Sequence, residues 1–161
     1  MLRIPPGTGT WLSVPALRAN HTLSSSWWKD PENLHLTLQF VGRDLEREQV
    51  GWMLRSALQL EPQPLHFTGR YDVLRTGKGA HLVALVDSEP LLGARDRLRN
   101  LLKRDPKIVL RDQFKFNPHV TLLEAPPGTE LVIPEPLEPG TITATELEVK
   151  YGSRRMVVDL A

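Results

Sequence analysis

The chain has 161 residues, of which 40% are hydrophobic and 24% are charged. This length and composition fit one domain, which could consist of two small lobes, and they do not fit a disordered chain. The net charge of +1 is far from the strongly basic balance of proteins that hold nucleic acid by charge alone. The absence of cysteine excludes disulfides, thiolate metal sites and cysteine nucleophiles.

The sequence shows no signal for export or for a membrane. Its first residues lack the apolar run of a signal peptide, and no stretch approaches the roughly 18 apolar residues of a membrane span. We therefore expect one cytoplasmic domain over residues 1–161, with no membrane partner.

Alternating and periodic patterns predict the elements of the first part of the chain. A short strand is expected at 11–14, and a weak pattern at 16–26 fits a short helix. A clear alternating strand follows at 34–41 and ends at Gly42. Asp44 suits the N-cap of the next helix. The expected buried face of that helix holds Val50, Met53, Leu54, Ala57 and Leu58.

The second part of the chain predicts a hairpin, a helix and further strands. Strands at 65–74 and 80–86 are joined by a turn at 76–79. Ser88 or Asp87 can cap the next helix. Its expected buried face holds Leu91, Leu92, Arg95, Leu98, Leu101 and Leu102, and the remaining strands are expected at 119–123, 141–150 and 154–160. Antiparallel hairpins mixed with helices favour an α+β protein over a doubly wound parallel sheet.

The most informative feature is a repeated string of four residues. HLTL at residues 35–38 is echoed by HVTL at 119–122, and each copy follows a turn that contains proline and asparagine. A shuffled chain of this composition holds roughly 0.1 His-x-Thr-Leu strings, so two copies are not expected by chance. A weaker third string at 66–68 is followed by Gly69, and we assign it no role.

The spacing of the repeat has a chemical consequence. Side chains alternate along a strand, so the His and Thr of each copy share one face while the apolar residues enter the core. If the two strands are neighbours, His35, Thr37, His119 and Thr121 meet in one cleft. The hydroxyls can donate to phosphate oxygens, and one imidazole can act as a base while the other acts as an acid. This predicts an in-line displacement at phosphorus with no metal or other cofactor.

Two other interpretations of the histidines compete with the catalytic one. A single histidine on a strand is more often structural, with its nitrogens bonded to backbone. A histidine pair can bind zinc, but threonine is a poor ligand and the sequence holds neither His-x-x-x-His nor His-Glu-x-x-His. The duplication favours the catalytic interpretation.

Residues 31–42 (PENLHLTLQFVG) and 116–122 (FNPHVTL) make the sequence similar to the 2H phosphoesterase superfamily. Within it, the chain resembles the 2′-5′ RNA ligase, or RNA 2′,3′-cyclic phosphodiesterase, family over residues 11–160. The resemblance implies a bilobal α+β fold in which two antiparallel sheets with flanking helices surround a central cleft with pseudo-twofold symmetry.

The resemblance also implies a reaction and residue roles. A 2′,3′-cyclic phosphate at an RNA end or in a nucleotide is opened to a 2′-phosphate. His35 would protonate the leaving 3′-oxygen and His119 would activate water, or the two roles would be exchanged. Thr37 and Thr121 would hold the phosphate oxygens. The family often has a basic residue shortly after the second motif, and Glu124 departs from that pattern.

Further residues near the motifs are candidates for substrate binding. Phe116 could stack a base, although a core position is more common for phenylalanine. Lys115 precedes it directly. Tyr151, Arg154 and Arg155 near the last hairpin could contact phosphate, although exposed arginines usually only aid solubility.

Two alternative functions stay open at this point. The same cleft could act on another cyclic or 2′-5′ phosphodiester. The chain could also be a non-catalytic module that binds RNA ends or nucleotides, which Glu124 mildly favours. We expect the protein to be a monomer in either case.

Overall fold

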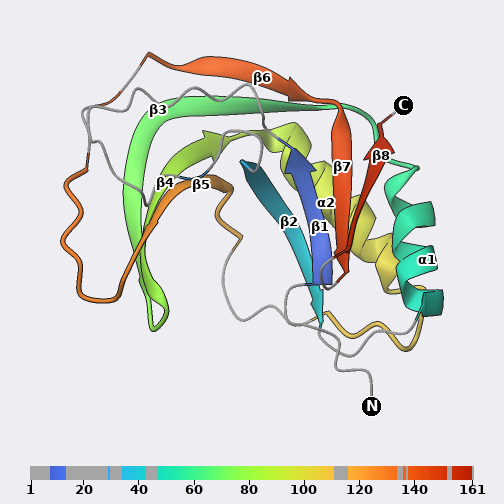
Figure 1. Ribbon diagram of the computed structural model, residues 1–161. Helices are drawn as coiled ribbons and strands as arrows, with labels where there is room; N and C mark the ends of the chain where they lie inside the picture. The colour runs from blue at the N-terminus through green and yellow to red at the C-terminus, as the bar shows by residue number, and fades with distance from the viewer. Residues whose placement is uncertain are drawn as a thin grey trace.

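The computed structural model describes residues 8–13, 29, 34–42, 47–110, 116–133, 136, 138–151 and 154–160. Within these ranges it contains eight strands, all paired antiparallel, and two helices, which confirms the predicted α+β class (Figure 1). In chain order the elements are β1 (Thr8–Ser13), β2 (His35–Gly42), α1 (Arg47–Ala57), β3 (Gln63–Thr76), β4 (Gly79–Asp87), α2 (Glu89–Leu102), β5 (His119–Ala125), β6 (Gly140–Ala144), β7 (Glu146–Tyr151) and β8 (Arg154–Asp159).

The strands form two groups of four that meet in the middle of the hydrogen-bonded order β6-β3-β4-β5-β2-β1-β7-β8. The two predicted sheets correspond to these groups, β6-β3-β4-β5 and β2-β1-β7-β8. In Figure 1 the second group stands side by side, while β3, β4 and β5 arch away from it. The groups join where Leu36 of β2 pairs with Val120 of β5. The pseudo-twofold axis and the central cleft stay predictions.

The arch of the first group follows from an irregularity in its longest strand. The pairing of β3 with β4 shifts register between Phe67 and Tyr71. Gly69 lies inside this interval with a φ of 78°, a left-handed conformation that costs glycine little. Extra residues in one strand bend and twist it, which accounts for the curve of β3 in Figure 1.

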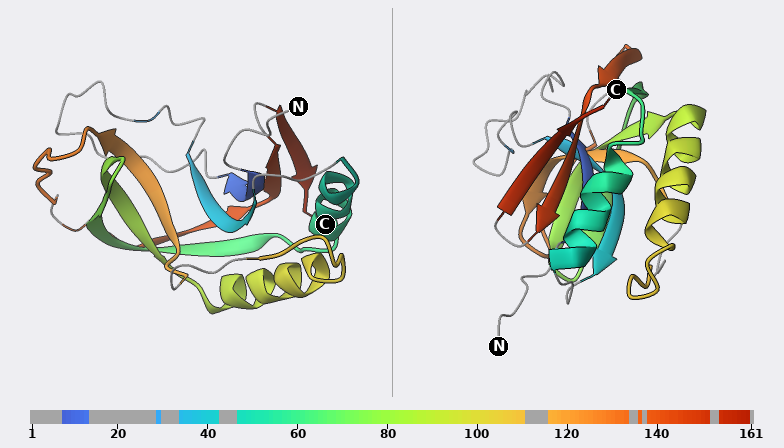
Figure 2. Two further views of the ribbon diagram at one scale, coloured as in Figure 1. Left: turned by 90° about the horizontal axis from the view of Figure 1, so that it is seen from below. Right: turned by 90° about the vertical axis from the view of Figure 1, so that its right-hand side faces the viewer.

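Both helices cover the same face of the strands, where the hydrophobic core lies (Figure 2). Ser88 caps α2 as predicted, because its side chain accepts a hydrogen bond from the backbone N–H of Leu91 at 3.4 Å. Leu91, Ala94 and Leu98 of this helix are fully buried in the core. Neither helix of the described chain is long and apolar enough to cross a membrane.

Two leucines that were expected in the core are exposed. Leu58 follows the last residue of α1 and is 58% exposed, because the apolar spacing continues beyond the point where the helix ends. Leu92 is 45% exposed, because it projects about 100° around α2 from the buried Leu91 and Ala94 takes the inward position.

The single strand expected at 141–150 is two strands. β6 ends at Ala144 and β7 begins at Glu146, so Thr145 separates them. β6 pairs with β3 of the first group, whereas β7 pairs with β1 of the second. The alternation of side chains continues past Thr145 without a break. The sequence pattern therefore does not reveal that the chain passes from one group of strands to the other at this residue. The helix expected at 16–26 and the cap expected at Asp44 lie outside the described residues.

Candidate active site

The apolar residues of the two motifs are buried and the polar residues are not. Leu36 and Val120 are 0% exposed, and Leu38 and Leu122 are 1% and 2% exposed. His35, His119 and Thr121 are half-buried, and Thr37 is exposed. The alternation expected along both motif strands is confirmed.

Pairing with the neighbouring strands places the polar residues of each motif on one face. Ser13 of β1 pairs with His35, and Trp11 pairs with Thr37. Trp11 and Ser13 are alternate residues of β1 and therefore share a face. Paired residues lie on the same face of a sheet, so His35 and Thr37 share that face too. The pairing of β5 with β4 gives the same result for the second motif. His119 and Thr121 pair with alternate residues of β4, so they also share one face.

The two motifs come together at the junction of β2 and β5. Because the buried Leu36 and Val120 pair directly, their polar neighbours all lie on the opposite face of the sheet. The strands are antiparallel, so His35 lies beside Thr121, and Thr37 lies beside His119. Each histidine is therefore next to the threonine of the other motif. The structure thus brings together the four residues that the sequence selected.

Asn117 fixes the protonation pattern of one ring. His119 Nδ1 lies 2.7 Å from the backbone oxygen of Asn117. A carbonyl oxygen can only accept, so Nδ1 carries the hydrogen and donates it. In the neutral ring, Nε2 then holds the lone pair. His119 is therefore prepared to accept a proton at Nε2.

Hydrogen bonds from α2 hold the first motif strand in position. Arg95 Nε donates to the backbone oxygen of Leu38, the last residue of the first motif, at 3.0 Å. Arg99 donates to the side-chain oxygen of the buried Gln39 at 2.8 Å. Both arginines contact β2 from the core face, which α2 covers. Their hydrogen bonds therefore do not occupy the polar face that holds His35 and Thr37.

The family model described as the 2′-5′ RNA ligase superfamily matches residues 11–149, a span that includes both motif strands. The chain belongs to this superfamily. No curated protein matches it significantly in sequence.

Solved structures share the fold of this 2′-5′ RNA ligase superfamily member at low sequence identity. A phosphoesterase structure has a TM-score of 0.62 at 20% identity and covers 99% of this chain and 95% of its own. Apo LigT of E. coli has a TM-score of 0.62 at 22% identity, with coverages of 99% and 94%. E. coli LigT complexed with 3′-AMP has a TM-score of 0.58 at 22% identity, with coverages of 83% and 78%.

The other predicted binding residues do not gather at the four motif residues. Phe116 is half-buried against the core, and the Arg95 guanidinium lies 4.2 Å from its ring centroid. Alternation along β8 places the exposed Arg154 on the face opposite His35. Lys115 lies outside the described residues, as does the side chain of Tyr151.

Arg155 lies on the same face as the motif residues, on β8, which is three strands beyond β2. Its neighbour across the ladder in β7 is Lys150, which pairs with Gly9 of β1. Arg155 Nε forms an ion pair of 3.5 Å with Glu148 Oε2. The structure thus favours the core alternative for Phe116. It places Arg155, rather than Arg154, on the motif face, which is the face of the sheet that carries the histidines and threonines of the two motifs.

A cluster of three polar residues, Lys29, His81 and Glu124, lies on the motif face next to Thr121. Glu124 pairs with His81 of β4, and its Oε1 lies 3.1 Å from Lys29 Nζ and 3.7 Å from His81 Nδ1. The backbone N–H of Lys29 donates to the backbone oxygen of Leu122 at 2.9 Å, which places Lys29 alongside β5. Glu124 is therefore a paired carboxylate.

No pattern in the sequence predicts this cluster, since its members come from three distant segments. The register of β4 and β5 pairs His81 with Glu124, and the backbone bond to Leu122 adds Lys29. Other titratable groups lie elsewhere in the fold. His66 Nδ1 lies 3.0 Å from Thr141 Oγ1 between β3 and β6. Burial raises the pKa of Tyr71, whose ring packs against the core and not on the motif face. In the described part of the chain, no three His, Asp or Glu side chains are grouped so as to hold a metal ion.

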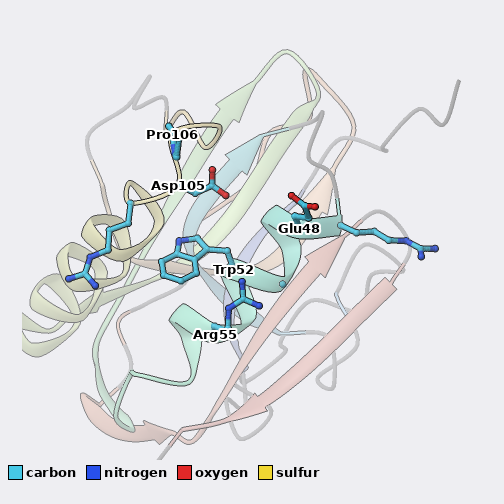
Figure 3. A pocket seen from close by; sticks show the side chains of 8 residues that line it. Glu48, Trp52, Arg55, Asp105 and Pro106 are labelled. Atoms are coloured by element: carbon cyan, nitrogen blue, oxygen red, sulfur yellow. The ribbon is translucent and has the colours of Figure 1, made fainter.

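A pocket of about 640 Å³ lies on the helix side of the molecule, away from the motif face (Figure 3). It is lined by Arg47, Glu48, Gly51, Trp52, Arg55, Arg104, Asp105 and Pro106. Trp52 lies in its centre, and the indole N–H donates to the backbone oxygen of Leu101 at 2.9 Å. This bond joins α1 to the end of α2, which gives the tryptophan a structural role.

Proposed function

We propose that this member of the 2′-5′ RNA ligase superfamily is a phosphodiesterase that opens 2′,3′-cyclic phosphates of RNA ends or nucleotides to 2′-phosphates. The observation that supports this most is the meeting of two histidines and two threonines on one face, at the junction of antiparallel strands. Membership of the superfamily supports phosphoesterase chemistry in general. A nucleotide as substrate agrees with the E. coli LigT structure complexed with 3′-AMP.

In the proposed reaction, His119 acts as the base. Its Nε2 takes a proton from water while the water oxygen bonds to phosphorus, and the bond from phosphorus to the 3′-oxygen breaks. The hydrogen bond from Nδ1 to Asn117 supports this role, because it leaves the lone pair on Nε2 and stabilises the positive charge that the ring gains.

His35 completes the proton balance as the acid. It donates a proton to the 3′-oxygen as that oxygen leaves, so the product has a free 3′-hydroxyl and a 2′-phosphate. Thr37 and Thr121 donate hydrogen bonds to the non-bridging phosphate oxygens. Both proton transfers are assigned to imidazoles, so the proposed reaction uses no metal. A monomeric state and a cytoplasmic location stay predictions.

The experiment is hydrolysis of a nucleoside 2′,3′-cyclic phosphate by the purified protein in EDTA, with the products resolved by phosphorus NMR. We expect turnover, and a nucleoside 2′-phosphate as the only phosphorus product. A 3′-phosphate product would refute the proposed bond cleavage. The proposal fails if no cyclic nucleotide and no RNA with a cyclic phosphate end is hydrolysed.

A further inference from the structure

The motif face extends from β2 across β1 and β7 to β8, the last strand of the hydrogen-bonded order (Figure 1). Thr37 pairs with Trp11 of β1, and Trp11 pairs with Glu148 of β7. Paired residues lie on the same face of a sheet, so Glu148 belongs to the motif face. Its side chain is only 14% exposed, which makes it a largely buried carboxylate that the proposed reaction does not use.

Two basic residues, which we name the basic pair, lie at one end of these strands: Lys150 of β7 and Arg155 of β8. They pair directly across the ladder, and Lys150 is two residues from Glu148, so all three share the motif face. At the opposite end of the same strands this face carries Glu146 and Asp159, which pair with each other. All four of these end residues are exposed. This part of the motif face is therefore positive at one end and negative at the other.

Glu148 holds one member of the basic pair in place. Its Oε2 lies 3.5 Å from Nε of Arg155, which reaches it diagonally from the neighbouring strand. A buried carboxylate is costly unless it is paired, so Glu148 favours the conformation of Arg155 that lies along the motif face. A guanidinium carries five N–H donors in a fixed fork, which lets it contact a carboxylate through Nε and a phosphate through its other nitrogens.

The two sides of the motif junction differ in what they offer a polyanion. Neighbouring strands are about 4.8 Å apart, so β7 and β8 lie about 10 and 14 Å from β2 across the sheet. A nucleotide chain that leaves the motifs in this direction meets two cations. In the other direction it meets the apolar Val83 and Leu85 of β4, which pair with the second motif, and then Glu124, whose charge Lys29 balances.

We propose that the basic pair binds a backbone phosphodiester of an RNA substrate, on the 5′ side of the cyclic phosphate end that the four motif residues hold. This inference rests on the proposed function, because the end must be bound at the motifs for the chain to extend across β1 and β7. Each backbone phosphate carries a negative charge, so the basic pair adds affinity that a single nucleoside cyclic phosphate cannot use. Glu148 is a positioning residue for Arg155.

The experiment compares two substrates that share the same terminal nucleoside 2′,3′-cyclic phosphate. One is that cyclic nucleotide alone, and the other is an RNA tetranucleotide that ends in it. We expect Arg155→Gln and Lys150→Gln each to raise KM for the tetranucleotide about three- to thirtyfold, the range of a hydrogen bond between charged groups that solvent partly screens. KM for the cyclic nucleotide should not change.

Salt dependence gives a second measurement, and Arg154→Gln gives the matched control. The slope of log KM for the tetranucleotide against log salt concentration should fall by about 0.7 for each lost phosphate contact. Arg154→Gln removes the same charge from the adjacent residue, which lies on the opposite face. We expect it to leave both KM values and the slope near those of the wild type.

Glu148→Gln separates positioning from general attraction. It removes a negative charge from the motif face, so attraction alone predicts a lower KM for the tetranucleotide. Loss of the position of Arg155 predicts a higher KM, and we expect this rise with KM for the cyclic nucleotide unchanged. A lower KM for the tetranucleotide would overturn the positioning role.

An equal change of KM for both substrates in Arg155→Gln, an equal effect of Arg154→Gln, or no effect of either variant would overturn the inference. So would hydrolysis of the cyclic nucleotide without hydrolysis of the tetranucleotide. If the wild type hydrolyses neither compound, the proposed function fails separately. The inference is then decided by calorimetric binding of a nucleoside 2′-phosphate and of a tetranucleotide with a 2′-phosphate end to wild type and Arg155→Gln. Selective loss of tetranucleotide binding supports it, and equal binding by both proteins overturns it.

Discussion

The two faces of the central strands β2 and β5 differ in what they contribute. On one face Leu36 and Val120 are fully buried under the helices. On the other, His35 and His119 are half-buried and lie beside threonines. Successive residues of one strand thus have different roles. Those on the buried face stabilise the fold, and those on the motif face take part in the proposed chemistry. A substitution on one face should therefore affect one property and leave the other nearly unchanged.

The largest expected effect is on the motif face. We expect His119→Ala and His35→Ala each to lower kcat about 10²- to 10⁴-fold, since each removes one proton-transfer group. The free energy of unfolding should change by no more than about 0.5 kcal/mol, as for a residue outside the core. Steady-state kinetics on the cyclic nucleotide and urea unfolding measure the two quantities.

His119→Asn is the matched control for the shape and polarity of the ring. It can keep a hydrogen bond near Asn117 but cannot take up a proton. We expect its kcat to be as low as that of His119→Ala. Near-wild-type activity of both variants would show that His119 is not the base.

The second prediction concerns the buried face of the same strand. Leu36→Ala should lower the free energy of unfolding by about 2 to 5 kcal/mol, because it leaves a cavity under the helices. The folded fraction should keep most of its kcat, since the side chain points away from the proposed phosphate site. The adjacent Thr37→Ala is the control, and urea unfolding should show it close to wild type. Equal loss of stability in both would remove the distinction between the faces.

The sequence predicted this distinction well up to the end of each motif. Alternation gave the faces of His35 and His119, and the repetition gave their association. It failed immediately afterwards, at Gln39 and Phe40. Leu38 has no partner in β1, and this β-bulge buries Gln39 and exposes Phe40, the reverse of what strict alternation predicts. The same limit hid the contact of Lys29 with Glu124, which no local pattern encodes.

The smallest expected effect tests a residue whose face the sequence left open. Phe116 precedes the second motif and was a candidate for base stacking, but its ring packs against the core under Arg95. We expect Phe116→Leu to lower the free energy of unfolding by about 1 to 2 kcal/mol, through lost volume and a lost cation–π contact. KM for the cyclic nucleotide should stay unchanged, because the ring packs against the core. A raised KM with unchanged stability would instead put Phe116 in contact with the substrate. The division between the two faces would then no longer hold for the residues that flank the second motif.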